Sequence, residues 1–178
     1  MLPMLIVIAG LIGTGKTTIA KALSARLEIP LCSIDEEKER VYRSHPEYRR
    51  HVDEGVPFPD DLRKQAFDAT LDKLRALAKT HRHAVVEETF HKRHLREPFL
   101  NAAAALFGGK CVIFVTADDV VIRKRLNERK EHMAGVKMYE AFRKVFEPFA
   151  KVDYTVENNG MVEESIENAT EFVKAHLD

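Results

Sequence analysis

Short runs of apolar residues alternate along the chain with longer segments in which apolar residues recur every three or four positions. The short runs predict strands at residues 4–9, 31–33, 84–88, 111–115 and 153–156. The periodic segments predict helices at residues 16–27, 62–78, 96–106, 118–130, 138–149 and 162–173. Strands that alternate with helices are typical of a parallel sheet with helices on both faces. The pattern therefore predicts an α/β fold in a single domain, residues 1–178.

Two stretches do not follow this alternation. Residues 35–40 are all charged, which predicts the exposed face of a helix. Residues 43–61 contain three prolines and show no sustained period, which favours a mobile loop or short helices that cover a site. We expect residues from about 36 to 61 to cover the bound acceptor of a reaction.

The first predicted strand is followed by the sequence GLIGTGKTT, residues 10–18. Gly10, Gly15, Lys16 and Thr17 have the spacing of a Walker A phosphate-binding loop. Glycines allow successive backbone N–H groups to turn toward a polyphosphate, and the helix that begins near Lys16 adds its positive N-terminal end. The lysine supplies a charge for the outer phosphates, and the threonine hydroxyl is a ligand for Mg²⁺. The sequence therefore predicts a nucleotide-binding site, with ATP and Mg²⁺ as cofactors.

Composition excludes several other classes of protein. The 28 basic and 28 acidic residues cancel, so we expect no general affinity for nucleic acid or other polyanions. The apolar run at 4–9 is too short to span a membrane and lacks the features of a signal peptide. Cys32 and Cys111 lie in apolar segments, which predicts reduced core thiols. We therefore expect a cytoplasmic protein without a membrane partner.

The densest polar cluster surrounds the predicted strand at 84–88. Because ligands of open parallel sheets bind outside the carboxyl ends of the strands, residues 87–96 are candidates for a binding site. Four histidines flank the same strand, namely His81, His83, His91 and His94. The two pairs are separated by the strand, about 15 Å at roughly 3.3 Å per residue, so we do not expect them to share a transition metal. A contact of His91 or His94 with substrate stays open.

Two arginines lie four positions apart on the helix predicted at 118–130. Arg125 and Arg129 therefore share one side of that helix, where both could meet one anion or nucleotide. The alternative is an exposed basic face paired with Glu128 and Glu131.

With these residues identified, the chain resembles the small P-loop kinases related to adenylate and gluconate kinases. It is most similar to the group of ATP-binding kinase-like domains that includes polynucleotide kinases and zeta toxins. The resemblance covers nearly the whole chain, although only the Walker loop is specific by itself. It implies a three-layer P-loop NTPase fold with a five-stranded parallel sheet of order 2-3-1-4-5 and a short helical lid, here at about residues 125–137.

The resemblance also implies roles for individual residues. Asp35 matches the aspartate that accepts the proton of the attacking hydroxyl, which agrees with the chemistry that a hydroxyl nucleophile needs. Glu87 stands where the family usually has Asp, so it serves either magnesium or substrate. Arg125 matches an arginine that stacks on adenine, and Arg129 one that meets phosphate. The turn at 158–160 resembles the loop that closes over the adenine edge.

We accordingly expect ATP-dependent phosphoryl transfer to a hydroxyl of a small molecule. The expected catalytic residues are Lys16, Asp35 and Arg129. The expected nucleotide-binding residues are Gly10, Gly13, Thr14, Gly15, Lys16, Thr17, Thr18, Arg125 and Arg129. The expected acceptor-binding residues are Asp35, Lys38, Glu87, Thr89, Arg93 and Arg96. The expected magnesium ligands are Thr17 and Glu87.

Many cations fall on the acceptor side, which favours an anionic acceptor unless they pair with neighbouring glutamates. Two other functions stay open. One is a nucleotide or polynucleotide 5′-hydroxyl kinase, with base-stacking aromatics drawn from Tyr42, Tyr48, Phe58 and Phe90. The other is an ATP-binding switch that hydrolyses the nucleotide slowly.

Overall fold

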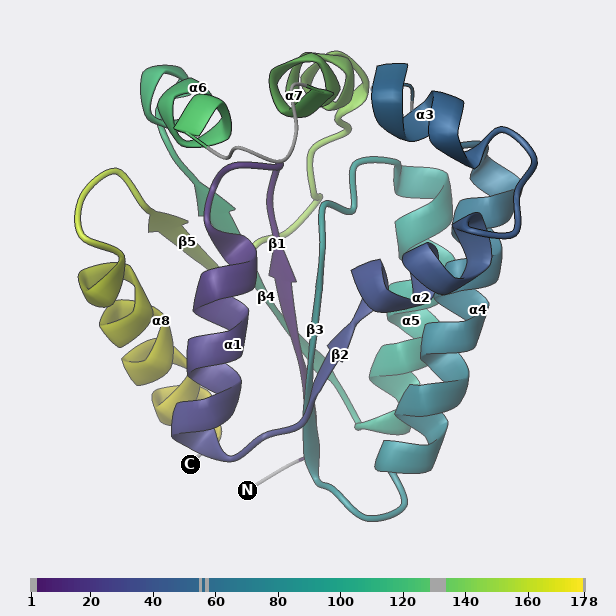
Figure 1. Ribbon diagram of the computed structural model, residues 1–178. Coiled ribbons are helices and arrows are strands. Elements are labelled where there is room, and N and C mark those ends of the chain that lie inside the picture. The colour runs from purple at the N-terminus through teal and green to yellow at the C-terminus, as the bar shows by residue number, and fades with distance from the viewer. Residues whose placement is uncertain (1–2, 55, 57, 129–133, 178) are drawn as a thin grey trace.

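The computed structural model describes residues 3–54, 56, 58–128 and 134–177. Within these residues, five parallel strands form one sheet in the order β2-β3-β1-β4-β5 (Figure 1). Strands and helices alternate along the chain. The elements are β1 (Met4–Ala9), α1 (Lys16–Leu27), β2 (Leu31–Ser33), α2 (Ile34–Tyr42), α3 (Tyr48–Glu54), α4 (Asp60–Leu77), β3 (His83–Glu88), α5 (Arg93–Leu106), β4 (Lys110–Thr116), α6 (Asp119–Glu128), α7 (Ala134–Val145), β5 (Tyr154–Glu157) and α8 (Val162–Leu177). The fold class and the strand order expected from the resemblance are confirmed.

The strand β1 lies at the centre of the sheet and is buried on both faces. It pairs with β3 on one side and β4 on the other, so that Ile6 lies between Val85 and Cys111. At the carboxyl end, Ala9 lies opposite Glu88. The loop that follows β1 therefore begins beside the polar residues that end β3.

Helices cover both faces of the sheet. The helices α1 and α8 lie on one face, and α4 and α5 lie on the other (Figure 1). The core beneath α1 and α8 includes Ile6, Ile19 and Ile166, and the core beneath α4 and α5 includes Val7, Phe67 and Phe99. The helices α3, α6 and α7 lie above the carboxyl ends of the strands, whereas both chain termini lie at the opposite end (Figure 1).

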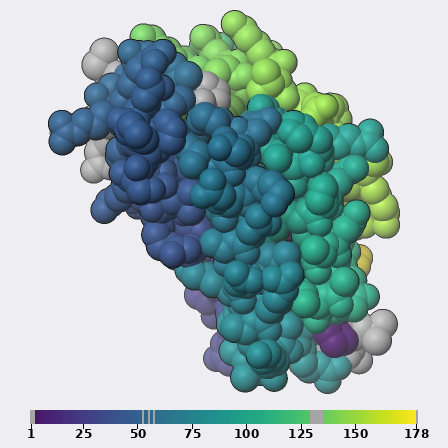
Figure 2. All heavy atoms as spheres, turned by 90° about the vertical axis from the view of Figure 1, so that its right-hand side faces the viewer, coloured from purple at the N-terminus to yellow at the C-terminus, as the bar shows by residue number. Residues whose placement is uncertain are grey.

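The charged stretch in α2 is less exposed than its composition predicts. Glu37 is only 3% exposed, because Lys73 of α4 and Arg40 of α2 both pair with its carboxylate. Figure 2 shows α2, α3 and α4 side by side on one face of the molecule. The expectation of a solvated helix face was wrong in this respect, since the partner lysine comes from a helix far along the chain.

Several helix boundaries differ from those expected, and the two that involve prolines have a clear cause. The helix α5 begins at Arg93 and contains Pro98, whereas the sequence predicted a start near Arg96. The N–H groups of Leu95 and Arg96 bond to the Lys92 carbonyl, so the first turn forms ahead of the proline. The helix α7 ends at Val145, because Pro148 cannot continue a helix.

In the part of the chain that the structure describes, no helix is long and apolar enough to cross a membrane. Cys32 and Cys111 are buried free thiols, and burial raises the pKa of both.

Candidate active site

The loop between β1 and α1 has backbone angles that only glycine adopts without strain. Gly13 and Gly15 have φ angles of 81° and 93°. A Cβ atom on Gly15 would also lie 2.3 Å from the Asn158 side-chain nitrogen. The loop therefore presents bare backbone where a polyphosphate would bind, and Lys16 follows as the first residue of α1.

A buried carboxylate adjoins this loop. Glu87, near the end of β3, is fully buried, and the Thr17 hydroxyl donates to its Oε2 at 3.3 Å. The Lys16 Nζ lies 4.0 Å from the same oxygen. Burial raises the pKa of the Glu87 carboxyl, and the Lys16 charge opposes that rise.

These groups fit a magnesium ion. The Oε1 atom of Glu87 is buried and has no hydrogen-bond partner among the described residues. Mg²⁺ prefers hard oxygen donors, which the Thr17 hydroxyl and the Glu87 carboxylate provide beside the phosphate-binding loop. The role of these two residues as magnesium ligands stays a prediction.

Asp35 faces the same space as the phosphate-binding loop. A cavity of about 140 Å³ is lined by Gly13, Lys16, Thr17, Asp35 and their neighbours in the loop. The Asp35 carboxylate is about half exposed and lies 3.0 Å from the Lys38 Nζ. The charges of Lys38 and Lys16 hold its pKa well below the usual range, although burial acts in the opposite direction. Asp35 is therefore an ionised hydrogen-bond acceptor at neutral pH.

The acceptor side contains an ionic cluster of four residues, Asp35, Lys38, Arg63 and Glu88, of which Arg63 and Glu88 are buried and Asp35 forms the exposed end. Lys38 pairs with both Asp35 and Glu88. Arg63 of α4, only 4% exposed, lies with its Nη1 3.2 Å from the Glu88 Oε1. Burial alone would lower the pKa of Lys38, but the negative charges of Asp35 and Glu88 have the larger combined effect and raise this pKa. Sequence reasoning anticipated Asp35 and Lys38 individually and included Glu88 only within the candidate segment 87–96, and it missed Arg63.

One sequence signal could have identified Arg63. It lies on the same side of α4 as Ala66, Phe67 and Thr70, which are all buried. An arginine on a buried helix face needs a partner carboxylate, and Glu88 at the end of a buried strand is one.

His91 lies in the loop that follows β3. Its ring is 1% exposed and stacks on Phe142 of α7, with 4.5 Å between the ring centroids. Burial, together with the charges of Arg63, Lys38 and Lys92, lowers the pKa of His91 to about 3, and Asp60 opposes this only weakly. His91 is therefore neutral throughout the physiological pH range.

This pKa predicts a loss of stability in mild acid. Below the pKa of an unfolded histidine, about 6.5, the unfolded chain binds a proton that the folded protein excludes until about pH 3. The stability contributed by neutral His91 is thus complete above pH 6.5 and falls as the pH decreases. The free energy of unfolding of the wild-type protein should fall as the pH decreases from about 6.5 to 5. In His91→Asn this fall should be smaller by about 1–2 kcal/mol, as measured by urea denaturation at each pH.

The control for this prediction is His81→Asn, which alters an exposed histidine. Burial also lowers the pKa of His83, so the pH dependence of the unfolding free energy of the wild-type protein contains the contributions of both His91 and His83. The difference between His91→Asn and wild type isolates His91. Equal slopes in those two proteins would contradict the prediction.

On the opposite side of the loop lies a second cavity, of about 320 Å³. Its lining includes Gly15, Thr18, Arg125 and Asn158. The Asn158 amide donates to the Thr14 carbonyl at 2.8 Å, and Arg125 reaches the same carbonyl at 3.5 Å. The position of Arg125 suits a contact with the nucleotide. Arg129, expected to meet phosphate, lies outside the described residues, as does part of the predicted lid.

Of the remaining predicted acceptor residues, Thr89 is buried at the end of β3, and Arg93 is exposed and paired with Glu97. Arg96 is 1% exposed, and its guanidinium donates to the carbonyls of Phe90, Glu147 and Pro148. Through these bonds the Arg96 guanidinium holds the backbone of two separate segments of the chain together. The expectation that Arg96 binds the acceptor is therefore not supported by its contacts.

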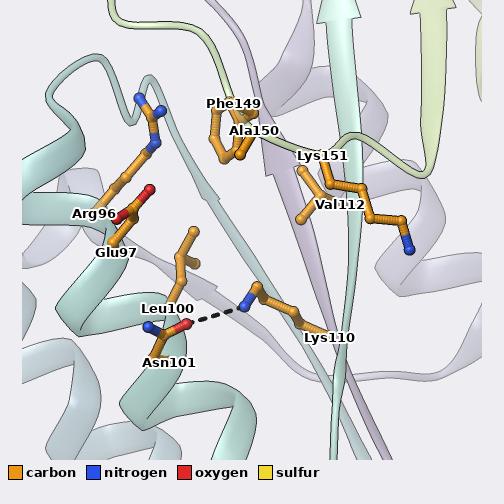
Figure 3. A pocket seen from close by; sticks show the side chains of 9 residues that line it. All are labelled: Arg96, Glu97, Leu100, Asn101, Lys110, Val112, Phe149, Ala150 and Lys151. Carbon is orange, nitrogen blue, oxygen red and sulfur yellow. Dashed lines mark hydrogen bonds between the residues drawn. The ribbon is translucent and has the colours of Figure 1, made fainter.

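Arg96 also borders a pocket of about 190 Å³ between α5 and β4 (Figure 3). Its guanidinium lies 4.2 Å from the centre of the Phe149 ring, and Lys110 bonds to Asn101 across the pocket. The Phe90 carbonyl that Arg96 holds belongs to a residue with φ of +51°, a strained backbone conformation for a bulky residue. Arg96 therefore stabilises the loop that follows Glu87 and Glu88.

We expect Arg96→Met to lower the free energy of unfolding by about 2–3 kcal/mol, because it leaves buried carbonyls without donors. Arg93→Met is the matched control. It removes an exposed ion pair and should cost less than about 1 kcal/mol. Urea denaturation measures both values, and equal losses would contradict the structural role of Arg96.

The cations expected to attract an anionic acceptor are largely neutralised within the protein. The ion pairs on this side are Arg40–Glu37, Arg43–Glu39, Arg50–Glu47, Arg50–Glu54, Lys38–Asp35, Lys38–Glu88 and Arg93–Glu97. The surplus of cations therefore does not support an anionic acceptor.

The aromatic residues considered for base stacking pack on one another. Tyr42 stacks on Phe58 at 4.0 Å between centroids, and Tyr48 lies 6.0 Å from the same ring. Phe90 is 1% exposed and packs between Phe67 and Phe99.

Among the residues described, no three His, Cys, Asp or Glu side chains are grouped so that they could hold a metal ion.

Together, the sheet order, the Walker loop and the carboxylates beside it define a P-loop protein with the fold of small kinases. A family model described as an AAA domain matches residues 5–149, and the chain belongs to this family. No curated protein sequence matches the chain.

Solved structures with similar folds include several kinases. A sugar kinase from Janibacter sp. HTCC2649 is 17% identical with a TM-score of 0.76, over 98% of this chain and 95% of that one. A gluconokinase from Sinorhizobium meliloti 1021 is 22% identical with a TM-score of 0.70, over 98% of both chains. Shikimate kinase from Aquifex aeolicus VF5 is 18% identical with a TM-score of 0.57, over 97% of this chain and 98% of that one. At these identities the similarity establishes the fold.

Proposed function

We propose that this protein is a kinase that transfers the γ-phosphoryl group of ATP to a hydroxyl group of a small molecule. The observation that carries the proposal is that Lys16, Thr17 and Asp35 all line one cavity. It joins a phosphate-binding loop to an ionised carboxylate that can orient a hydroxyl. Those are the two requirements of phosphoryl transfer, which depends mainly on positioning and electrostatic stabilisation.

In the proposed reaction, the acceptor hydroxyl oxygen forms a bond to the γ-phosphorus. The bond from that phosphorus to the β–γ bridging oxygen breaks, and ADP leaves with the electron pair. Lys16 and the loop N–H groups stabilise the charge that develops on the phosphate oxygens. Asp35 accepts a hydrogen bond from the hydroxyl, orients it, and receives its proton before releasing it to solvent. Its lowered pKa makes it a weak base, so orientation is its larger contribution.

Thr17 and Glu87 would hold Mg²⁺, which supplies positive charge against the phosphate oxygens. Arg125 would contact the nucleotide from α6, and we retain Arg129 in the proposed site as a phosphate contact from the sequence resemblance. Lys38, Thr89 and Arg93 stay candidates for the acceptor side. The free thiols of Cys32 and Cys111 are compatible with a reducing compartment, and we propose a cytoplasmic location.

A label-transfer experiment tests the proposed activity. The protein is incubated with Mg²⁺, ATP labelled in the γ-phosphate and a deproteinised fraction of small cellular metabolites. We expect the label to appear in an organic phosphate ester. If it appears only as inorganic phosphate, at the same rate with and without the metabolites, the protein is a hydrolysing switch and the kinase proposal is wrong.

A further inference from the structure

Three buried polar atoms border the ionic cluster of Asp35, Lys38, Arg63 and Glu88 without a hydrogen-bond partner among the described residues. They are the Tyr42 hydroxyl, the Arg63 Nε and the His91 Nε2. Their residues are 5%, 4% and 1% exposed. Buried polar atoms are nearly always paired in folded proteins, and an unpaired one points to a missing water, ion or ligand.

The three atoms belong to one region although they come from three elements. Arg63 of α4 pairs with Glu88, which also pairs with Lys38 of α2. Burial raises the pKa of the Tyr42 phenol, and the charges of Arg63 and Lys38 oppose this rise. The same two charges add to burial in lowering the pKa of His91. Tyr42 also lies one helical turn after Lys38 on α2, and the Phe142 ring contacts both His91 and Arg63.

Aromatic rings accompany these polar atoms. Phe58 stacks on Tyr42, with His51 on Phe58 at 4.5 Å between centroids. Phe142 of α7 stacks on His91 and lies 5.6 Å from the Arg63 guanidinium. Ring faces beside hydrogen-bonding atoms suit a ligand that presents C–H and O–H groups next to each other.

The charges of the ionic cluster are balanced. Lys38 and Arg63 are its two cations, and Asp35 and Glu88 are its two carboxylates. A net charge brought into this buried region would lack a partner, which is costly in a medium of low dielectric constant. A ligand without charge would meet no such penalty.

We propose that the phosphoryl acceptor is an uncharged sugar or other polyol, and that Tyr42, Arg63 and His91 bind its hydroxyl groups. The Arg63 Nε–H donates to a ligand oxygen, whereas the Tyr42 hydroxyl and the neutral His91 Nε2 can each donate or accept. A hydroxyl group serves both roles, but a carboxylate can only accept. One further hydroxyl lies against Asp35 and is phosphorylated as described above, so the inference rests on the proposed kinase function.

The first test compares acceptors of different charge. ADP release is measured with Mg²⁺ and ATP in the presence of uncharged D-glucose, D-ribose, myo-inositol or glycerol, anionic D-gluconate or D-glycerate, or cationic kanamycin. We expect an uncharged compound to give the highest kcat/KM. A higher value for an anionic or cationic compound would overturn the proposal.

The second test removes one hydroxyl. Tyr42→Phe keeps the ring on Phe58 and should raise the KM for the best uncharged acceptor about tenfold, with less than a twofold change in the KM for ATP. Tyr154→Phe is the matched control, because Tyr154 of β5 also stacks on a phenylalanine, Phe172, away from the acceptor side. An unchanged acceptor KM in Tyr42→Phe, or equal effects in both variants, would overturn the assignment of Tyr42.

Binding of a nonhydrolysable ATP analogue with Mg²⁺ distinguishes a failure of the inference about the acceptor from a failure of the proposed kinase function. If the analogue binds and none of the uncharged compounds is phosphorylated, the inference about the acceptor is wrong while the nucleotide site stands. If the analogue does not bind, the kinase proposal fails and the inference fails with it.

Discussion

Replacing Lys16 with alanine should lower the kcat of phosphoryl transfer by about two to three orders of magnitude, which is typical of losing one group that stabilises transition-state charge. Lys16 is the first residue of α1 and is 7% exposed, so a cation from the solvent cannot easily take its place. The rate is measured as ADP release with the best acceptor. Turnover near that of wild type in a folded variant would contradict the role of Lys16.

The control for Lys16→Ala is Lys21→Ala. Lys21 is an exposed lysine of the same helix, and its loss should leave kcat within about twofold, since surface substitutions rarely act beyond their neighbourhood. Thermal unfolding of both variants distinguishes lost catalysis from lost structure. This check is needed because the Lys16 Nζ lies 4.0 Å from the buried Glu87 carboxylate.

Replacing Asp35 with asparagine should also reduce kcat by about two to three orders of magnitude, with little change in nucleotide affinity. Asparagine keeps the size of the side chain but removes its negative charge, so its neutral amide oxygen accepts a weaker hydrogen bond from the hydroxyl and cannot receive the hydroxyl proton. Glu36→Gln is the matched control, because Glu36 is the adjacent exposed carboxylate on α2. Equal losses in the two variants, or none in Asp35→Asn, would contradict the role of Asp35.

The pKa of Asp35 adds a second readout to the same variant. Lys38 and Lys16 keep this pKa well below its usual range, so Asp35 stays ionised as the pH falls from 8 to about 5. Any loss of rate over that interval must come from other groups. The fraction of kcat that is lost between pH 8 and about 5 should therefore be the same in Asp35→Asn and in wild type.

The nucleotide side of the site was predictable because its signal is local. The glycines, Lys16 and Thr17 are consecutive or nearly so, and their spacing alone specifies the loop between β1 and α1. The central strands β1, β3 and β4 were predictable because each contains a short apolar run that is buried in the sheet. Their order in space depends on long-range pairing, and it came from the family resemblance.

The acceptor side was less predictable because its contacts join distant parts of the chain. Arg63 and Glu88 are 25 positions apart, and Lys38 and Glu88 are 50 apart. The periodicity of α4 places Arg63 on its buried face, but it does not show which carboxylate elsewhere in the chain lies against it. Arg96 illustrates the opposite case, since its position after β3 suggested substrate binding, whereas its contacts are with the backbone carbonyls of Phe90, Glu147 and Pro148.

The charges of α2 show the same limit. Their number in the sequence suggested a solvated face and an anionic acceptor, yet Glu37 is buried against Lys73 and Lys38 is shared between Asp35 and Glu88. Whether a charge is free to meet a ligand depends on partners from other elements, which only the folded structure supplies.

Isothermal titration calorimetry with ATP at millimolar Mg²⁺ tests the central claim most directly. The phosphate-binding loop predicts heat of binding at one site per chain, and Lys16→Ala should weaken that binding while Lys21→Ala should not. No heat with either ATP or GTP in the wild-type protein would contradict the account.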